Sequence, residues 1–154
     1  MIQRVQSLYW LAAAICLSFL NFGMNVFTFK TKDAIYEFDF YSIVKFVNDK
    51  EISEKIIWIY PVSIFFTVLI VVSIFLFKKI KVQLKLSNRI KFGLSFIFFV
   101  LTLNAYLGVF VKNTESVVLG PGYFVLAIAV VFSYLASWRV KKDKKLLDSV
   151  DRIR

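Results

Sequence analysis

The sequence predicts an all-α membrane protein with four transmembrane helices, both termini in the cytoplasm, and a small extracytoplasmic β-hairpin plus a short helix between helices 1 and 2. Two observations predict this class. Of the 154 residues, 59% are hydrophobic and 18% are aromatic, whereas a soluble domain is closer to half apolar. The chain also contains four long stretches without Asp, Glu, Lys or Arg. We therefore expect residues 1–154 to form a single integral membrane domain.

Each of the four uncharged stretches has room for the about 20 helical residues that cross a hydrocarbon layer about 30 Å thick. Buried helices of a soluble protein are the alternative, but four of them would leave this short chain almost no polar surface. The fourth stretch is interrupted by Gly120, Pro121 and Gly122, and proline suits the first turn of a helix. We expect spans at about residues 5–27, 56–77, 91–111 and 121–140.

The segment between the first two spans, about residues 28–55, is the only sizeable loop predicted outside the membrane. Aromatic residues alternate around it, with Phe27 and Phe29 before a turn and Tyr36 and Phe38 after it. This alternation predicts a β-hairpin that pairs Phe29 with Tyr36 and Phe27 with Phe38 on one aromatic face. The residues that follow, Tyr41–Asp49, have the pattern of a short amphipathic helix.

Basic residues predict the orientation, because they accumulate on the cytoplasmic side of membrane proteins. Arg4, the second connection and the tail from Arg139 hold fourteen basic residues against three acids, and the other side holds six against seven. We therefore expect both termini in the cytoplasm. The formal charge of +10 is then a topology signal and an attraction to anionic lipid head groups, rather than a sign of nucleic-acid binding.

The basic tail, about residues 141–154, is the most patterned segment. Leu146, Val150 and Ile153 fall on one face at helical spacing. We expect the tail to continue the fourth helix and then to lie on the membrane or against a partner. A frayed basic tail is the alternative.

Acids are scarce on the predicted cytoplasmic side, which restricts how the tail can be held. Packing the tail across the base of the bundle would bring Asp148 or Asp151 towards Arg4 or Arg89, although pairing with tail cations three or four positions away is an open alternative. Gln6, close to Arg4, is expected at the membrane surface. The candidate residues for a cytoplasmic contact or lipid binding are Arg4, Lys78, Lys79, Lys81, Lys85, Arg89, Arg139, Lys141, Lys142, Asp148, Asp151 and Arg152.

No catalytic constellation is visible in the sequence. There is no His, and Cys16 is the single cysteine, which excludes an intramolecular disulfide. The uncharged stretches leave no charged residue in the interior of a predicted span, since Lys91 and Arg139 lie at span ends. The acids of the outside loop are interleaved with lysines, as on a solvated face. We therefore predict no catalytic, cofactor-binding or metal-binding residue and no cofactor. Asn21, Asn25 and Asn104 either bond between helices or line a polar path.

Three segments of the chain resemble a known bacterial family: the opening Met1–Gln6, the basic turn Phe77–Lys85 and the ending Lys142–Arg154. Together they look like the domain-of-unknown-function 4293 (DUF4293) family, and the resemblance covers the whole chain. Lys144 stands where an acid is common in that family, and Asp148 stands where a basic residue is common. The resemblance implies a four-span protein of the bacterial inner membrane and assigns no activity, substrate or catalytic residue.

The leading functional hypothesis is a non-catalytic accessory or scaffolding subunit of a membrane complex, with a membrane-protein partner and the lipid bilayer as its contacts. The lack of chemistry inside the predicted spans and the patterned residues at both cytoplasmic ends favour it. A small oligomeric transporter or channel is the alternative, and it requires the span asparagines to face a lumen. An enzyme ranks third, because the sequence supplies no evident base, nucleophile or metal site.

Overall fold

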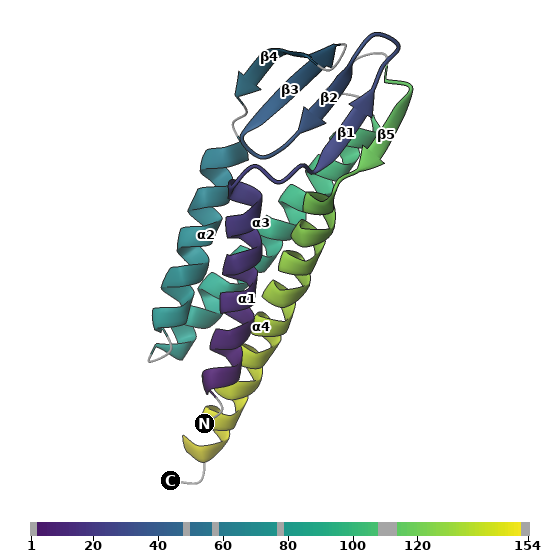
Figure 1. The fold of residues 1–154 in the computed structure, drawn as a ribbon. Coiled ribbons are helices and arrows are strands. Elements are labelled where there is room, and N and C mark those ends of the chain that lie inside the picture. Colours follow the sequence, from purple (N-terminus) through teal and green to yellow (C-terminus); the bar gives the residue numbers. More distant parts are fainter. Residues whose placement is uncertain (1–2, 48–49, 57–58, 77–78, 108–113, 152–154) are drawn as a thin grey trace.

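The computed structural model describes residues 3–47, 50–56, 59–76, 79–107 and 114–151. In these ranges four helices form a bundle, and a five-stranded antiparallel sheet caps one end of it (Figure 1). The first and last described residues lie at the end of the bundle away from the sheet. In chain order the elements are α1 (Gln3–Asn21), β1 (Phe27–Lys30), β2 (Ile35–Phe38), β3 (Ser42–Val47), β4 (Lys50–Ile56), α2 (Ile59–Phe75), α3 (Ile80–Tyr106), β5 (Ser116–Leu119) and α4 (Pro121–Asp151).

The sheet overturns the predicted all-α class, and the prediction of four transmembrane helices is wrong. Among the described helices only α3 and α4, with 27 and 31 residues, are long and apolar enough to cross a membrane. The helices α1 and α2 have 19 and 17 residues. An uncharged stretch does not distinguish a helix from a strand with one buried face. The first stretch therefore leaves α1 through Gly23, which has a positive φ of 83°, and ends in β1.

The basic connection expected between the second and third spans is mostly helix. Since α3 begins at Ile80, Lys81, Lys85 and Arg89 lie on its first turns instead of in a loop. Lys and Arg are good helix formers, so these turns extend the helix beyond its apolar part. The helix α4 begins at Pro121, as predicted, and continues through the tail to Asp151. The expected continuation of the fourth helix into the tail is therefore confirmed.

The β1–β2 hairpin has the register that the aromatic alternation predicts. Phe29 pairs with Tyr36, and Phe27 pairs with Phe38. A backbone hydrogen bond of 3.0 Å closes the turn between the strands. The register places the large rings on the face towards the helices, because side chains two residues apart in a strand share a face.

The short helix expected over Tyr41–Asp49 is wrong. Ser42–Val47 form the strand β3, which pairs antiparallel with β2 and β4. Ile43 and Val44 are β-branched and fit a pleated sheet better than an isolated helix. The hairpin therefore continues into a meander, and β5 completes the strand order β4-β3-β2-β1-β5.

The strand β5 joins the sheet from late in the chain and fixes α4 beneath it. Gly120 N donates a hydrogen bond to the Val26 carbonyl (2.9 Å), and Gly122 N donates to the Asn25 carbonyl (2.8 Å). A Cβ atom at Gly120 would lie 2.5 Å from the Asn25 carbonyl oxygen. Glycine is therefore required where the entrance of α4 crosses the exit of α1, and one free N–H group of the helix start gains a partner.

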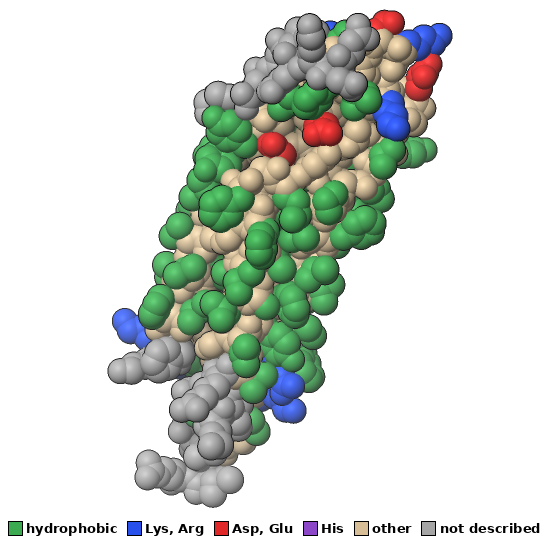
Figure 2. Space-filling model, viewed as in Figure 1, with side chains coloured by type: hydrophobic (Ala, Val, Ile, Leu, Met, Phe, Trp, Pro, Cys, Tyr) green, Lys and Arg blue, Asp and Glu red, His purple; other side chains and the backbone are tan. Residues whose placement is uncertain are grey.

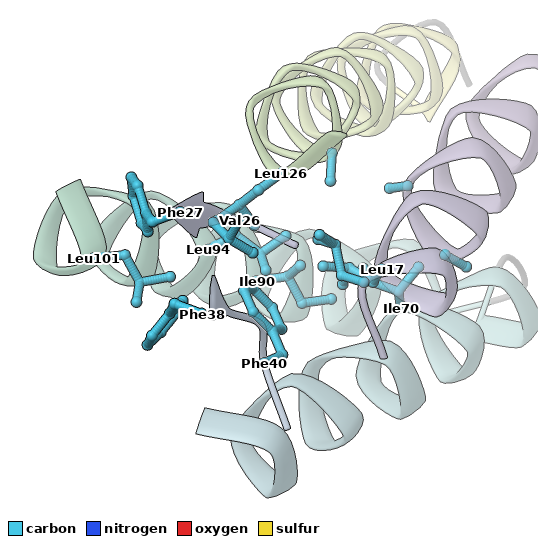
Figure 3. Packing of buried hydrophobic residues seen from close by; sticks show 14 of the residues in the cluster. Leu17, Val26, Phe27, Phe38, Phe40, Ile70, Ile90, Leu94, Leu101 and Leu126 are labelled. Carbon is cyan, nitrogen blue, oxygen red and sulfur yellow. The ribbon is translucent and has the colours of Figure 1, made fainter. Parts of the chain in front are cut away.

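The sheet and the bundle share one apolar core. Phe27 and Phe38 on the inner face of the sheet, and Phe40 in the β2–β3 connection, are at most 1% exposed. Figure 3 shows these rings in the same cluster as Leu101 of α3 and Leu126 of α4. Burying one such side chain stabilises the folded state by about 1.5–3 kcal/mol.

The outward faces of the bundle are strongly apolar. Green side chains cover the helices between the sheet and the opposite end of the molecule in Figure 2. On α3, Phe92, Phe96 and Phe99 are 65%, 67% and 62% exposed. Large contiguous apolar surfaces of this kind are rare on soluble monomers and mark contact with a membrane or another protein.

Candidate functional site

Basic side chains gather on the described helices at the end away from the sheet. Lys79, just before α3, and Lys81, Lys85 and Arg89 on α3 are exposed. Lys141 and Lys142 on α4 are also exposed, while Arg139 is half-buried. These residues belong to the set expected from the sequence, and the structure brings those on α3 and those on α4 to the same end of the bundle. The site described below lies within this basic end.

Four members of the expected set lie outside the described side chains: Arg4, Lys78, Asp151 and Arg152. The predicted contacts of Arg4 and Asp151 therefore stay predictions. Asp148 is exposed, and on the tail Leu146 and Leu147 are 43% and 48% exposed. Of the predicted apolar face of the tail, only Leu146 lies among the described side chains, and it is exposed.

A groove of about 400 Å³ runs between α3 and α4 at the basic end. Asn88 and Lys91 of α3 form one wall, and Lys141 of α4 forms part of the other. The aromatic rings of Tyr134 and Trp138 lie along the α4 side. The groove therefore combines two ammonium groups, an amide and a phenol with an apolar lining.

Cations in and around the groove lie against aromatic rings. Lys91 Nζ is 5.1 Å from the ring centre of Phe92 and 5.6 Å from that of Tyr134. Arg139 and Lys142 lie over the ring of Trp138, at 5.1 and 5.7 Å. Such cation–π contacts are worth about 0.5–1 kcal/mol when exposed. They hold the positive charges next to the helices instead of leaving them free in solvent.

A smaller hollow of about 220 Å³ adjoins this region on α4. It is lined by Trp138, Lys141, Lys142 and Lys145. Trp138 and Lys141 line both hollows. The basic end thus offers one continuous surface with an aromatic centre and several lysines around it.

Inside the bundle, a layer of buried polar side chains lies next to the basic end. Gln6, Ser73, Gln83 and Ser87 are each 0% exposed. Gln83 Nε2 donates to the Ser73 carbonyl (2.9 Å), and Ser87 Oγ donates to Ser137 Oγ (2.6 Å). All four helices contribute to this layer, so it links them where the apolar core ends.

Several polar atoms of this layer have no hydrogen-bond partner in the described part of the chain. They include both amide atoms of Gln6, Ser73 Oγ and Gln83 Oε1. The side chain of Gln6 faces the bundle interior, and the expectation that its segment lies at the membrane surface stays a prediction. Buried polar groups without partners are costly and commonly bind water.

Asp143 is the one acid buried among the described side chains of α4, and it is only 5% exposed. Both of its carboxylate oxygens lack a hydrogen-bond partner among the described residues. It lies beyond Trp138, where the uncharged part of α4 ends, and so outside the apolar segment. Burial raises the pKa of this carboxyl, and the charges of Arg139 and Lys142 counteract that rise.

The three asparagines considered for a polar path bond to separate partners. Asn21 accepts from Ser63 and donates to Thr67 Oγ1 (3.4 Å), so it connects α1 with α2. Asn25 donates to Thr28 (2.9 Å), and Asn104 donates to a carbonyl one turn earlier in its own helix (2.7 Å). These bonds are those of helix packing and local structure. The path through the three asparagines has no support from them.

The sequence pointed to the basic end but not to the groove itself. Asn88 and Tyr134 were overlooked, because neither is charged and each is an ordinary residue of a helix. Their position in the sequence was the available signal. Asn88 is one helical turn before Lys91, which precedes an uncharged stretch, and Tyr134 is one turn before Trp138, which ends another. No group of three or more His, Cys, Asp or Glu residues suited to a metal ion occurs in the described ranges.

Fold and surface together define the class of protein: a helical bundle capped by an antiparallel sheet, with two helices that could cross a membrane. The chain belongs to the DUF4293 family, since the family model described as "Domain of unknown function (DUF4293)" matches residues 2–153. The resemblance seen at the two ends and at the basic turn is thereby confirmed. A comparison with curated proteins found no match.

Proposed function

We propose that this chain is a membrane-embedded, non-catalytic accessory subunit that presents its sheet to a partner protein. The observation that carries the proposal is the apolar outer surface of the bundle, which separates a basic end from the sheet (Figure 2). The bilayer covers this surface, with α3 and α4 crossing it and α1 and α2 packed alongside them. The lipid bilayer and one partner protein are then the contacts of the chain.

Charge supports an orientation with the basic end in the cytoplasm of a bacterium and the protein in its inner membrane. Basic residues near helix ends favour the cytoplasmic side. The β1–β2 turn carries both Lys32 and Asp33, so the sheet end has no comparable excess of positive charge. Both termini are then cytoplasmic, and the sheet lies on the outer side.

The free edge of β5 supports a protein partner. The strand is last in the order β4-β3-β2-β1-β5, and Val117, Val118 and Leu119 are 39%, 48% and 46% exposed. An edge strand offers unpaired backbone groups to a strand of another chain, and apolar side chains add specificity. The occupant we assign to this edge is an extended segment of the partner protein.

Site-specific photo-cross-linking in cells tests the partner. A cross-linking residue at Val118 is compared with one at Glu37, which lies in register on the same face of the sheet but two strands from the edge. We expect a product heavier than the chain by one distinct partner at Val118 and not at Glu37. No product at Val118, or one of twice the chain's mass, would overturn the accessory role; the second result would favour a homo-oligomer such as a small transporter.

Reporter fusions test the orientation separately. A reporter fused after Arg154 should be active only in its cytoplasmic form. One inserted at Asp33, in the β1–β2 turn, should be active only outside. The reverse pattern at either site contradicts the proposed orientation without bearing on the partner.

A further inference from the structure

We propose that the groove between α3 and α4 binds the phosphate head group of an anionic phospholipid. This inference rests on the membrane placement proposed above, and it assigns a defined lipid site to one part of the basic end. The sequence predicted only a general attraction between basic residues and anionic lipids. The proposal here is a specific pocket, with its own hydrogen-bond donors and an adjoining apolar surface for an acyl chain.

The groove has the donors that a phosphate diester needs. Lys91 and Lys141 supply two ammonium groups, and Asn88 supplies an amide N–H. Ser95 Oγ donates its single proton to the Lys91 carbonyl (2.8 Å), so Tyr134 Oη, 3.3 Å from Ser95 Oγ, is the donor in that weaker contact and can turn its proton to a phosphate oxygen. No carboxylate lines the groove within the described chain, so no negative charge there repels a bound anion.

Aromatic contacts direct Lys91 into this groove. Its Nζ atom lies near the rings of Phe92 and Tyr134, and the residue is half-buried. A lysine restrained in this way loses less side-chain entropy when it binds an anion. Lys142 and Arg139, over Trp138, add positive potential at the rim.

The level of the groove along the helices fits a membrane interface. Lys91 directly precedes the uncharged stretch of α3, and Trp138 is the last residue of the uncharged stretch of α4. Trp and Tyr favour the head-group region, and basic pockets between helices on the cytoplasmic side bind anionic head groups. The groove thus opens where phosphates of the inner leaflet lie.

An apolar surface continues from the groove towards the sheet, which favours a lipid over free phosphate. At helical spacing beyond the groove, α3 presents Phe92 and Phe99, 65% and 62% exposed, and α4 presents Val131, 56% exposed. An acyl chain attached to the bound phosphate would cover these side chains. Inorganic phosphate would leave them bare.

Native mass spectrometry of the full chain, purified in mild detergent, tests the site. Wild-type protein is mixed with phosphatidylglycerol or with phosphatidylcholine, and retained lipid is counted. We expect one tightly retained phosphatidylglycerol. Retention should fall roughly tenfold or more in the double variant Lys91→Gln, Lys141→Gln, because each basic group near an anionic lipid contributes about 1 kcal/mol. Equal retention of both lipids, or no change in the double variant, would overturn the proposal.

Two further arms exclude trivial explanations. The double variant Lys30→Gln, Lys32→Gln removes the same charge at the sheet end and should retain the lipid. Tyr134→Phe removes only the phenolic donor, so a smaller loss of retention is expected in a chain that keeps its ring packing. If millimolar inorganic phosphate displaces the lipid completely, the site is one for free anions and the lipid assignment fails.

The outcome can be separated from the proposed function. Membrane extraction and the Val118 cross-link do not depend on the groove lysines. A chain that stays in the membrane and cross-links to its partner, yet binds phosphatidylglycerol no better than phosphatidylcholine, contradicts the lipid site alone. A chain absent from the membrane fraction contradicts both.

Discussion

Some polar side chains at the basic end are buried without hydrogen-bond partners, which costs folding free energy that the packing of the rest of the fold must offset. Gln6 and Asp143 are buried, and their side-chain oxygens have no hydrogen-bond partner in the described ranges. The sequence could not predict this, because a polar residue near the end of an apolar stretch is read as facing solvent. The Gln6 amide is inside because other helices of the bundle pack against α1.

Replacing Asp143 with Asn should raise thermal stability, and the gain should depend on pH. Because burial raises the folded pKa of this carboxyl above the unfolded value of about 3.9, the folded chain holds the proton to higher pH. Stability is greatest below the unfolded pKa and falls as pH rises through the folded pKa. The difference in Tm between Asp143→Asn and wild type, measured in detergent from pH 4 to 7, should therefore grow with pH.

Asp148→Asn is the matched control, since Asp148 is on the same helix but exposed. It should change Tm little at any pH. A Tm difference for Asp143→Asn that stays constant across the pH range would contradict the raised pKa of this buried carboxyl.

At the scale of elements, the hairpin was predictable and the full sheet was not. Alternation of Phe27, Phe29, Tyr36 and Phe38 has period two, and the register followed from it. The strand β3 was read as a helix because its apolar residues are nearly continuous, a pattern that fits both. The strand β5 was hidden in an uncharged stretch, since its pairing with β1 is a long-range contact that local sequence does not encode.

The buried face of β2 provides a test of this architecture. Phe38→Lys should destabilise the fold severely, because it removes a ring that is 0% exposed and buries a charge. Loss of Phe alone costs about 3–5 kcal/mol. The neighbouring Glu37→Lys, on the exposed face, should change little. Limited proteolysis of the two variants measures the difference in stability. Equal cleavage rates would contradict the placement of Phe38 on the buried face of β2 and of Glu37 on the exposed face.

The junction of β5 with α4 provides a second test. Gly120→Ala places a Cβ 2.5 Å from the Asn25 carbonyl oxygen, which is backbone and cannot turn away. We expect a loss of about 1–3 kcal/mol, the usual cost of overpacking. Ser116→Ala, exposed on the strand β5 that precedes Gly120, is the control. Unfolding followed by tryptophan fluorescence compares them, and similar midpoints would show that the crossing is not tight.

At the scale of the whole molecule, the composition predicted an apolar exterior. It did not predict how many helices are long enough to span a bilayer. Counting charges treated every uncharged stretch alike, so residues that form strands were assigned to transmembrane spans or to the uncharged stretches around them. The basic end was anticipated by the same counting, because charge is additive and does not depend on register. The groove was not, because it requires α3 and α4 to lie side by side.

Membrane placement predicts a position-dependent cost for charge on α4. Ile128 and Leu147 are equally exposed, at 47% and 48%, but only Ile128 lies within the uncharged stretch. Ile128→Arg should reduce membrane integration, since arginine at a helix centre costs about 2.5–3.5 kcal/mol. Leu147→Arg should not. Carbonate extraction measures both, and equal extraction would place the bundle outside the bilayer.

The long helix α4 gives the molecule a mechanical property. Its 31 residues extend about 46 Å at about 1.5 Å per residue, without a break between the sheet and the basic end. Its first turn is bonded to the carbonyl of Asn25, just before β1, and its far end bears the groove and the tail. A force applied to the edge of β5 is therefore transmitted along one continuous helix to the basic end.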